Sequence, residues 1–314
     1  MQSSCRLFLG LIIFTFWTAP HTSERILQTA VLAASQQNEG HRLLHEADRT
    51  AFLHNWAKAE ISFRKAEVFF QRSGDVRNQT YAHVGRLRGT VETLSLPTVS
   101  AEIGDILKTE LAQTDLQLRL LCLVSKGDID FQIDPKSSKR LWEEVESLAQ
   151  KVDQPIWKNR ARAELGTIAF YDGEIFRAMH MIASAYVETE RQHDSAWMIR
   201  DLAAFGEGFA DLGRNEDARR FFERSIRLAE ATPDAEVPFT AHLGKAKILI
   251  ALNQRAEGKA MLDRLLQEAC SRGMQVREAR LRIVLGDFAE KNGDRTEAIT
   301  HFERLWCKRR RFWQ

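Results

Sequence analysis

Residues Ala203–Ala229, AAFGEGFADLGRNEDARRFFERSIRLA, contain the pattern that decides the fold. On each side of Gly213, in Ala203–Leu212 and in Glu216–Ala229, apolar residues recur at spacings of three and four, and charged residues occupy the remaining face. This is the spacing of an amphipathic α-helix, and glycine readily adopts the left-handed conformation of a helix end. The stretch therefore predicts two packed helices joined by a turn.

The same pattern recurs every 40 residues through the C-terminal half. Each copy has a turn residue, a small residue seven positions earlier, a small residue five positions later and a large apolar residue nine positions later. In that order the four columns are Gly173, Gly213, Asn253 and Gly293; Gly166, Gly206, Ala246 and Gly286; Ala178, Ala218, Gly258 and Ala298; and Ile182, Phe222, Leu262 and Phe302. Small residues let helix backbones approach closely, and the large residue fills the space between them.

These columns resemble the tetratricopeptide repeat, which has Leu-Gly and then an aromatic residue in its first helix, and Ala and then an aromatic residue in its second. The copy most similar to it contains Phe205-Gly206, Phe209, Ala218 and Phe222, and another copy is visible in Ala47, Ala59, Phe63 and Ala66. The resemblance implies an all-α, right-handed solenoid of helical hairpins. Two features depart from the family: the period is longer, and Arg162, Leu202, His242 and Arg282 occupy the column of its tryptophan.

The repeat pattern divides the chain into four regions. We expect a signal peptide or membrane anchor in residues 1–23, one or more repeats in 24–96, a degenerate region with an insert in 97–150, and four repeats of 40 residues in 151–314. Within the degenerate region, Gly127–Ser138 is predicted to be an acidic connecting loop and Lys139–Gln150 a helix. No later helix is available to cover the last predicted one, Arg295–Leu305, so a truncated chain or a larger protein is expected.

The N-terminus has the order of a secretory signal. Arg6 precedes the uncharged run Leu7–Trp17, LFLGLIIFTFW, and a polar stretch follows. We expect export to an extracytoplasmic location, or membrane attachment because no clear cleavage site ends the run. The alternative is a helix packed on the solenoid in a cytoplasmic protein.

Composition and motifs indicate no catalysis, no metal and no cofactor. The 45 Lys and Arg nearly balance the 43 Asp and Glu, so no nucleic-acid partner is expected, although the terminal KRRRFWQ is locally basic. His41 and His45 lack a third metal ligand, and Asp128, Asp130 and Asp134 lack the glycine and glutamate of a calcium loop. Cys122 and Cys270 are expected to be buried thiols without a catalytic base, and Gly206-Glu207-Gly208 is only a fragment of a phosphate-binding pattern.

Two further columns are predicted to line a binding surface, because the first helix of each tetratricopeptide-like hairpin faces the concave side. One column contains Arg160, Arg200, Thr240 and Arg280, and the other contains Thr167, Glu207, Lys247 and Asp287. Three aligned guanidinium groups would suit carboxylates or an acidic peptide. Alternatively, these arginines pair with Glu164, Glu207 and Asp287.

The sequence therefore favours a non-catalytic scaffold that binds a protein or peptide. The alternative function is the sensory region of a larger signalling protein with a small ligand in the groove, and an enzyme of unrecognised type is a third possibility. The oligomeric state stays open.

Overall fold

The computed structural model describes the backbone of residues 39–312 and the side chains of residues 39–305, and from Arg42 onward the chain forms one compact unit. A helix that ends at Phe52 precedes the others, and residues 39–312 contain no strand. The further helices are α2 (Trp56–Ser73), α3 (Val76–Gly89), α4 (Leu96–Leu107), α5 (Glu110–Thr114), α6 (Leu116–Ile133), the 3-10 helix η1 (Pro135–Ser138), α7 (Lys139–Lys151), α8 (Pro155–Tyr171), α9 (Ile175–Arg191), α10 (Ser195–Asp211), α11 (Asn215–Ala231), α12 (Phe239–Ala251), α13 (Arg255–Ser271), α14 (Gln275–Lys291) and α15 (Arg295–Phe312).

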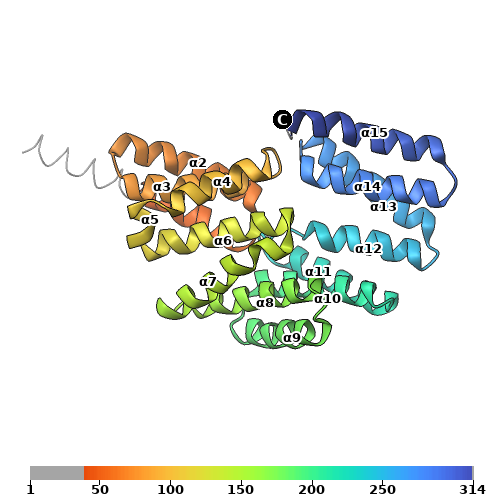
Figure 1. Cartoon of the computed structure of the whole chain (residues 1–314), viewed down its shortest axis with the longest axis horizontal. Helices are drawn as coiled ribbons and strands as arrows, with labels where there is room; N and C mark the ends of the chain where they lie inside the picture. The colour runs from red at the N-terminus through yellow and green to blue at the C-terminus, as the bar shows by residue number, and fades with distance from the viewer. Residues whose placement is uncertain (1–38, 313–314) are drawn as a thin grey trace, which may run out of the picture. The chain divides into compact units, whose positions relative to one another are not determined.

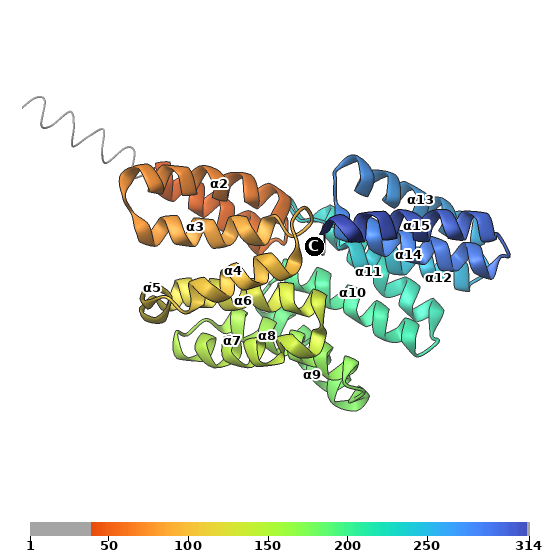
Figure 2. The same cartoon turned by 45° about the horizontal axis from the view of Figure 1, so that its top comes forward.

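Consecutive helices pack as antiparallel hairpins, and each hairpin packs on the next (Figures 1 and 2). The pairs α8 with α9 and α10 with α11 are among the most extensive contacts, and α11 in turn packs against α12. This arrangement confirms the predicted all-α solenoid of helical hairpins. It also confirms the predicted helix at Lys139, which ends at Lys151.

Left-handed residues terminate the helices at regular intervals. The turn column of the sequence has positive φ at every position: 81° at Gly173, 74° at Gly213, 66° at Asn253 and 80° at Gly293. A second set, which the sequence columns did not show, lies halfway between them at Asp153, His193 and Gly273, with φ of 52°, 54° and 65°. Aspartate and histidine enter this conformation more readily than most residues, so the turns at these three positions resemble those within the hairpins. The link from α11 to α12 is different, since Thr232, which caps the end of α11, has an extended conformation.

The ring of Phe222 shows how the hairpins pack. Its side chain is fully buried in α11, and a Cβ placed on Gly206 of α10 would lie 2.5 Å from its Cε1 atom. Gly244 of α12 approaches the same ring from the following hairpin. Only glycine leaves room for the ring on both sides. The N-terminal copy repeats this arrangement, since a Cβ on Gly85 would lie 2.5 Å from Phe63.

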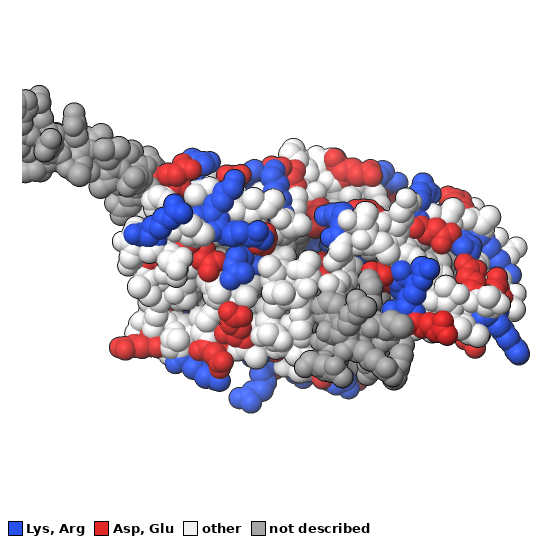
Figure 3. Space-filling view, turned by 90° about the horizontal axis from the view of Figure 1, so that it is seen from above, with Lys and Arg blue, Asp and Glu red and all other residues white. Residues whose placement is uncertain are grey.

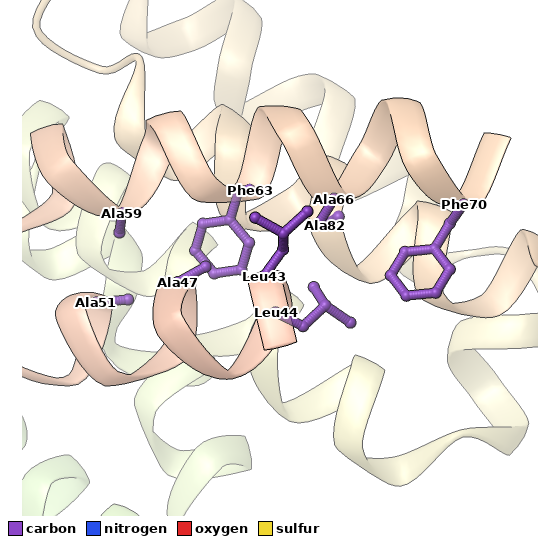
Figure 4. Close-up of a cluster of buried hydrophobic side chains, with 9 residues drawn as sticks. All are labelled: Leu43, Leu44, Ala47, Ala51, Ala59, Phe63, Ala66, Phe70 and Ala82. Atoms are coloured by element: carbon purple, nitrogen blue, oxygen red, sulfur yellow. The ribbon is translucent and has the colours of Figure 1, made fainter. Parts of the chain in front are cut away.

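The N-terminal core is built in the same way from small and large apolar residues. Figure 4 shows Phe63 of α2 directed toward the preceding helix, which carries Leu43 and Ala47. All three side chains are buried, and Ala66 and Ala82 complete the contact. Alanines at the close-contact positions allow the helices to approach around one aromatic ring.

Two local expectations from the sequence are wrong. The acidic connecting loop at Gly127–Ser138 is helical, because α6 continues to Ile133 and η1 follows it. Asp128 and Asp130 lie on α6, where ion pairs neutralise them: Asp128 Oδ2 lies 3.1 Å from Arg88 Nη2, and Asp130 Oδ2 lies 2.9 Å from Lys126 Nζ. Cys122 is buried as expected, whereas Cys270 is exposed, although its Sγ atom lies 3.7 Å from Arg282 Nη2 of α14. Phe302 packs against Gly286 but remains 37% exposed.

None of the helices in the described part of the chain is both long and apolar enough to cross a membrane. The apolar run Leu7–Trp17, on which the export prediction rests, lies outside the described residues.

Candidate binding groove

A cavity of about 440 Å³, here called the main cavity, lies between the N-terminal hairpin and the helices α10 and α14. Its walls come from the turn before α2 and from α2 itself, the end of α3, the start of α10, the segment 236–240 and the start of α14. A second cavity of about 120 Å³ continues from it between α8 and α10, since Arg200, Pro238 and Thr240 line both. Together these two cavities are called the groove.

Ion pairs between distant parts of the sequence form one side of the main cavity. Arg277 at the start of α14 donates from Nε to Glu92 Oε1 at 3.0 Å and from Nη1 to Glu236 Oε1 at 2.7 Å. The backbone amide of Gln275 also donates to the carbonyl of Glu92 at 2.9 Å. The two contacts with Glu92 join residues that are about 185 positions apart, so α14 is fixed against the loop that follows α3.

Asp234 also connects distant parts of the sequence through ion pairs and a hydrogen bond. Its carboxylate lies 2.6 Å from Lys58 Nζ and 2.8 Å from Arg49 Nη2, and its carbonyl accepts from Asn55 Nδ2 at 3.1 Å. Asp234 belongs to the segment between α11 and α12, which contains two prolines and replaces the first turn of a full-length helix. This segment therefore reaches the N-terminal hairpin and supplies Glu236 to the groove wall.

Arg160, one of the three predicted groove arginines, is buried and lines neither cavity. Its Nε and Nη2 atoms each lie 2.8 Å from the carboxylate of Asp194. The rings of Phe52 and Trp197 flank the guanidinium at 4.0 and 4.8 Å. Desolvated charges require such a partner, so Arg160 connects α8 to the start of α10 and lies outside the groove.

The other members of that column do line the groove. Arg200 contacts both cavities and forms an ion pair with Glu164, with 2.9 Å between Nη2 and Oε1. Thr240 also lines both cavities, and Arg280 of α14 lines the main cavity. Among the described residues, no carboxylate oxygen lies within 4.0 Å of the Arg280 guanidinium.

The residues of the second predicted column are more exposed than those of the arginine column. Thr167 is half-buried, whereas Glu207 of α10, Lys247 of α12 and Asp287 of α14 are exposed. None of these three charges has an ion-pair partner within 4.0 Å among the described side chains. Of the four residues of this column, Thr167 and Glu207 line the second cavity of about 120 Å³, and the other two do not. Although Glu207 is accessible to solvent, the surrounding protein partly desolvates its carboxylate and raises its pKa, and the positive charges of Arg280 and Lys247 oppose that shift.

Sequence reasoning missed the aromatic and histidine side chains of the main cavity. His54 lies before α2 with a φ of 58°, and its ring lies 5.1 Å from that of Trp197. Neither ring nitrogen has a hydrogen-bond partner among the side chains and backbone groups that the structure describes. Burial and the nearby arginines hold the pKa of His54 well below its usual value, so the ring is neutral. The only sequence signal was that histidine tolerates a left-handed turn.

The described residues contain no group of three or more His, Cys, Asp or Glu side chains that could hold a metal ion. On one face of the molecule, Lys and Arg are interspersed with Asp and Glu, without an extended area of one sign (Figure 3). The charges that could select a ligand are therefore the local ones of the groove.

No protein family model matches the chain, and no curated protein sequence matches it. Solved structures do match. The Rap conjugation gene regulator of the plasmid pLS20, in complex with the Phr* peptide, is 16% identical over 90% of this chain and 76% of that chain, with a TM-score of 0.63. NprR in complex with its cognate peptide NprX is 12% identical over 82% of this chain and 77% of that chain, with a TM-score of 0.55. At these identities the likeness shows a shared fold.

Proposed function

We propose that the chain is a non-catalytic scaffold that binds an extended peptide in the groove. The observation that carries this proposal is whether each arginine of the groove has a carboxylate partner within the protein. Arg200 and Arg277 line the groove and are each compensated by a carboxylate of the protein, whereas Arg280 lines it with no carboxylate within 4.0 Å among the described residues. A guanidinium in a concave site is a suitable partner for a ligand carboxylate, to which it can donate two parallel hydrogen bonds.

The second column supports the same function. Glu207, Lys247 and Asp287 place exposed negative, positive and negative charges on three successive hairpins. Positions one repeat apart come into line along a solenoid, so an extended peptide could contact them in sequence. The two solved structures of similar fold were each determined with a bound peptide, which agrees with this use of the fold.

A random heptapeptide phage library, selected against the protein, tests the proposal. Affinities of the enriched peptides would be measured by fluorescence anisotropy for the wild type and for Arg280→Gln. Because a hydrogen bond to a charged group contributes about 1.5–3 kcal/mol, we expect the substitution to weaken binding by roughly 10- to 100-fold. Arg220→Gln is the control, since Arg220 is on the outer side of α11 and 76% exposed. Failure to enrich any peptide, or equal affinities for all three proteins, would refute the proposal.

A second candidate is the sensory region of a larger signalling protein with a small ligand in the main cavity. The volume of about 440 Å³ favours it, because small-molecule sites usually occupy roughly 300–1,000 Å³.

The cellular location of the protein is a separate proposal. We infer export or membrane attachment from Arg6 and the run Leu7–Trp17.

A further inference from the structure

An apolar pocket of about 250 Å³ lies between the hairpin α8/α9 and the hairpin α10/α11. Figure 2 shows these helices side by side. Aromatic rings form much of its wall, and they support one another: Phe209 and Phe221 are stacked with centroids 5.1 Å apart, and Phe205 lies 5.4 Å from Phe221. This site is called the aromatic pocket. It adjoins the groove, because Thr167 and Glu207 line both.

The aromatic pocket leaves large apolar side chains in contact with water. Tyr171, Met179 and Leu212 all line it and are 53%, 48% and 50% exposed. Covering apolar surface is favourable by about 25 cal/mol per Å², and a contiguous exposed patch of this kind is typical of an interaction site. A ligand side chain placed here would remove several of these groups from water together.

Charge distinguishes between possible occupants of the aromatic pocket. Its only charged lining residues are Glu207 and Asp211, one helical turn apart on α10. Neither has an ion-pair partner within 4.0 Å among the described residues, although Arg280 and Lys247 act on Glu207 from a greater distance. Two carboxylates beside an apolar pocket favour a cation and oppose an anionic lipid surface.

We propose that the aromatic pocket binds an apolar side chain of the peptide ligand that is adjacent to a lysine or arginine, whose charge is held by Glu207 and Asp211. The inference rests on the proposed peptide-binding function and adds the chemistry of one part of the ligand. The same peptide would present a carboxylate to Arg280 in the main cavity. The groove thus selects a segment with an apolar and basic end and an acidic end.

Three blocked dipeptides test this specificity: acetyl-Phe-Arg-amide, acetyl-Phe-Glu-amide and acetyl-Ser-Arg-amide. Binding would be followed by the NMR shift of a ¹³C-labelled methyl group on Met179, which lines the pocket. We expect the Phe-Arg probe to bind at least tenfold more tightly than the other two. The double variant Glu207→Gln and Asp211→Asn should remove this preference without lowering the melting temperature, because both residues are exposed.

Equal binding of the Phe-Arg and Phe-Glu probes would overturn the inference, as would an unchanged preference in the double variant. The phage-selected heptapeptides separate this outcome from failure of the proposed function. If the heptapeptides bind, and their affinity falls in Arg280→Gln but not in the double variant, the groove binds peptides and the aromatic pocket is not part of the site. If no heptapeptide binds, the proposed function itself fails.

Discussion

Arg160 on α8 and Asp194 at the start of α10 form a buried ion pair with two contacts of 2.8 Å, and the side chains are 1% and 2% exposed. Asp194 also accepts from the backbone amide of Trp197 and so caps α10. One carboxylate therefore neutralises the arginine of one repeat and begins the first helix of the next.

Arg160→Gln should destabilise the protein. Removing one partner of a buried pair leaves the other charge uncompensated, which costs about 3–5 kcal/mol. Arg280→Gln serves as the comparison and should cost roughly 0.5 kcal/mol or less, because its guanidinium has no pair to lose. Urea denaturation followed by circular dichroism gives both values. Similar losses in the two variants would show that the Arg160 pair is not a structural element.

Phe222→Ala should cost on the order of 3–5 kcal/mol, since the ring fills a site that Gly206 and Gly244 leave open on both sides. Arg220→Ala on the same helix is the control, with an expected change within about 0.5 kcal/mol. Arg219 is less suitable because its side chain is only 34% exposed and lies 2.8 Å from Glu216, whereas Arg220 is 76% exposed and lies 3.9 Å from Asp217. Equal melting temperatures for the Phe222 and Arg220 variants would contradict the packing described above.

Asp201 should make stability depend on pH. Burial raises its pKa to about 8, and the negative charges of Glu164 and Asp194 act in the same direction, while the Thr189 hydroxyl and Arg200 oppose the shift. Between about pH 4 and pH 8 the unfolded chain loses this proton and the folded chain keeps it, so stability falls as pH rises. Asp201→Asn should remove this contribution to the pH dependence of the free energy of unfolding. The quantity to measure is the free-energy difference between wild type and variant at pH 5 and pH 8; a difference that does not change with pH would reject the assignment.

Arg277 and Glu92 should be energetically coupled. They are about one-fifth exposed, and they join α14 to the loop after α3. A double-mutant cycle with Arg277→Gln and Glu92→Gln should give a coupling energy of about 0.5–3 kcal/mol, which is the range for residues in one ion-pair network. The coupling should decrease at high salt because the pair is partly exposed. Additive effects of the two substitutions would show that this contact does not hold the groove wall.

Residues 1–23 should direct export, with Arg6 preceding the apolar run. Ile12→Asp places a charge within that run and should block the process. A reporter fused after residue 23 would be assayed on both sides of the membrane. Retention of the native fusion in the cytoplasm would rule out a signal.

The sequence by itself determined the helical hairpins and their 40-residue period, because close helix packing and left-handed turns restrict which residues can occupy a column. It left the intervening turns unrecognised, since Asp153 and His193 do not identify such a turn as glycine does. Only the tertiary structure decided which column members line the groove. Arg160 and Arg280 occupy the same repeat position, but Asp194 neutralises only Arg160. The groove wall, where Arg277 meets Glu92, depends on the accumulated stacking of many hairpins, which no local pattern specifies.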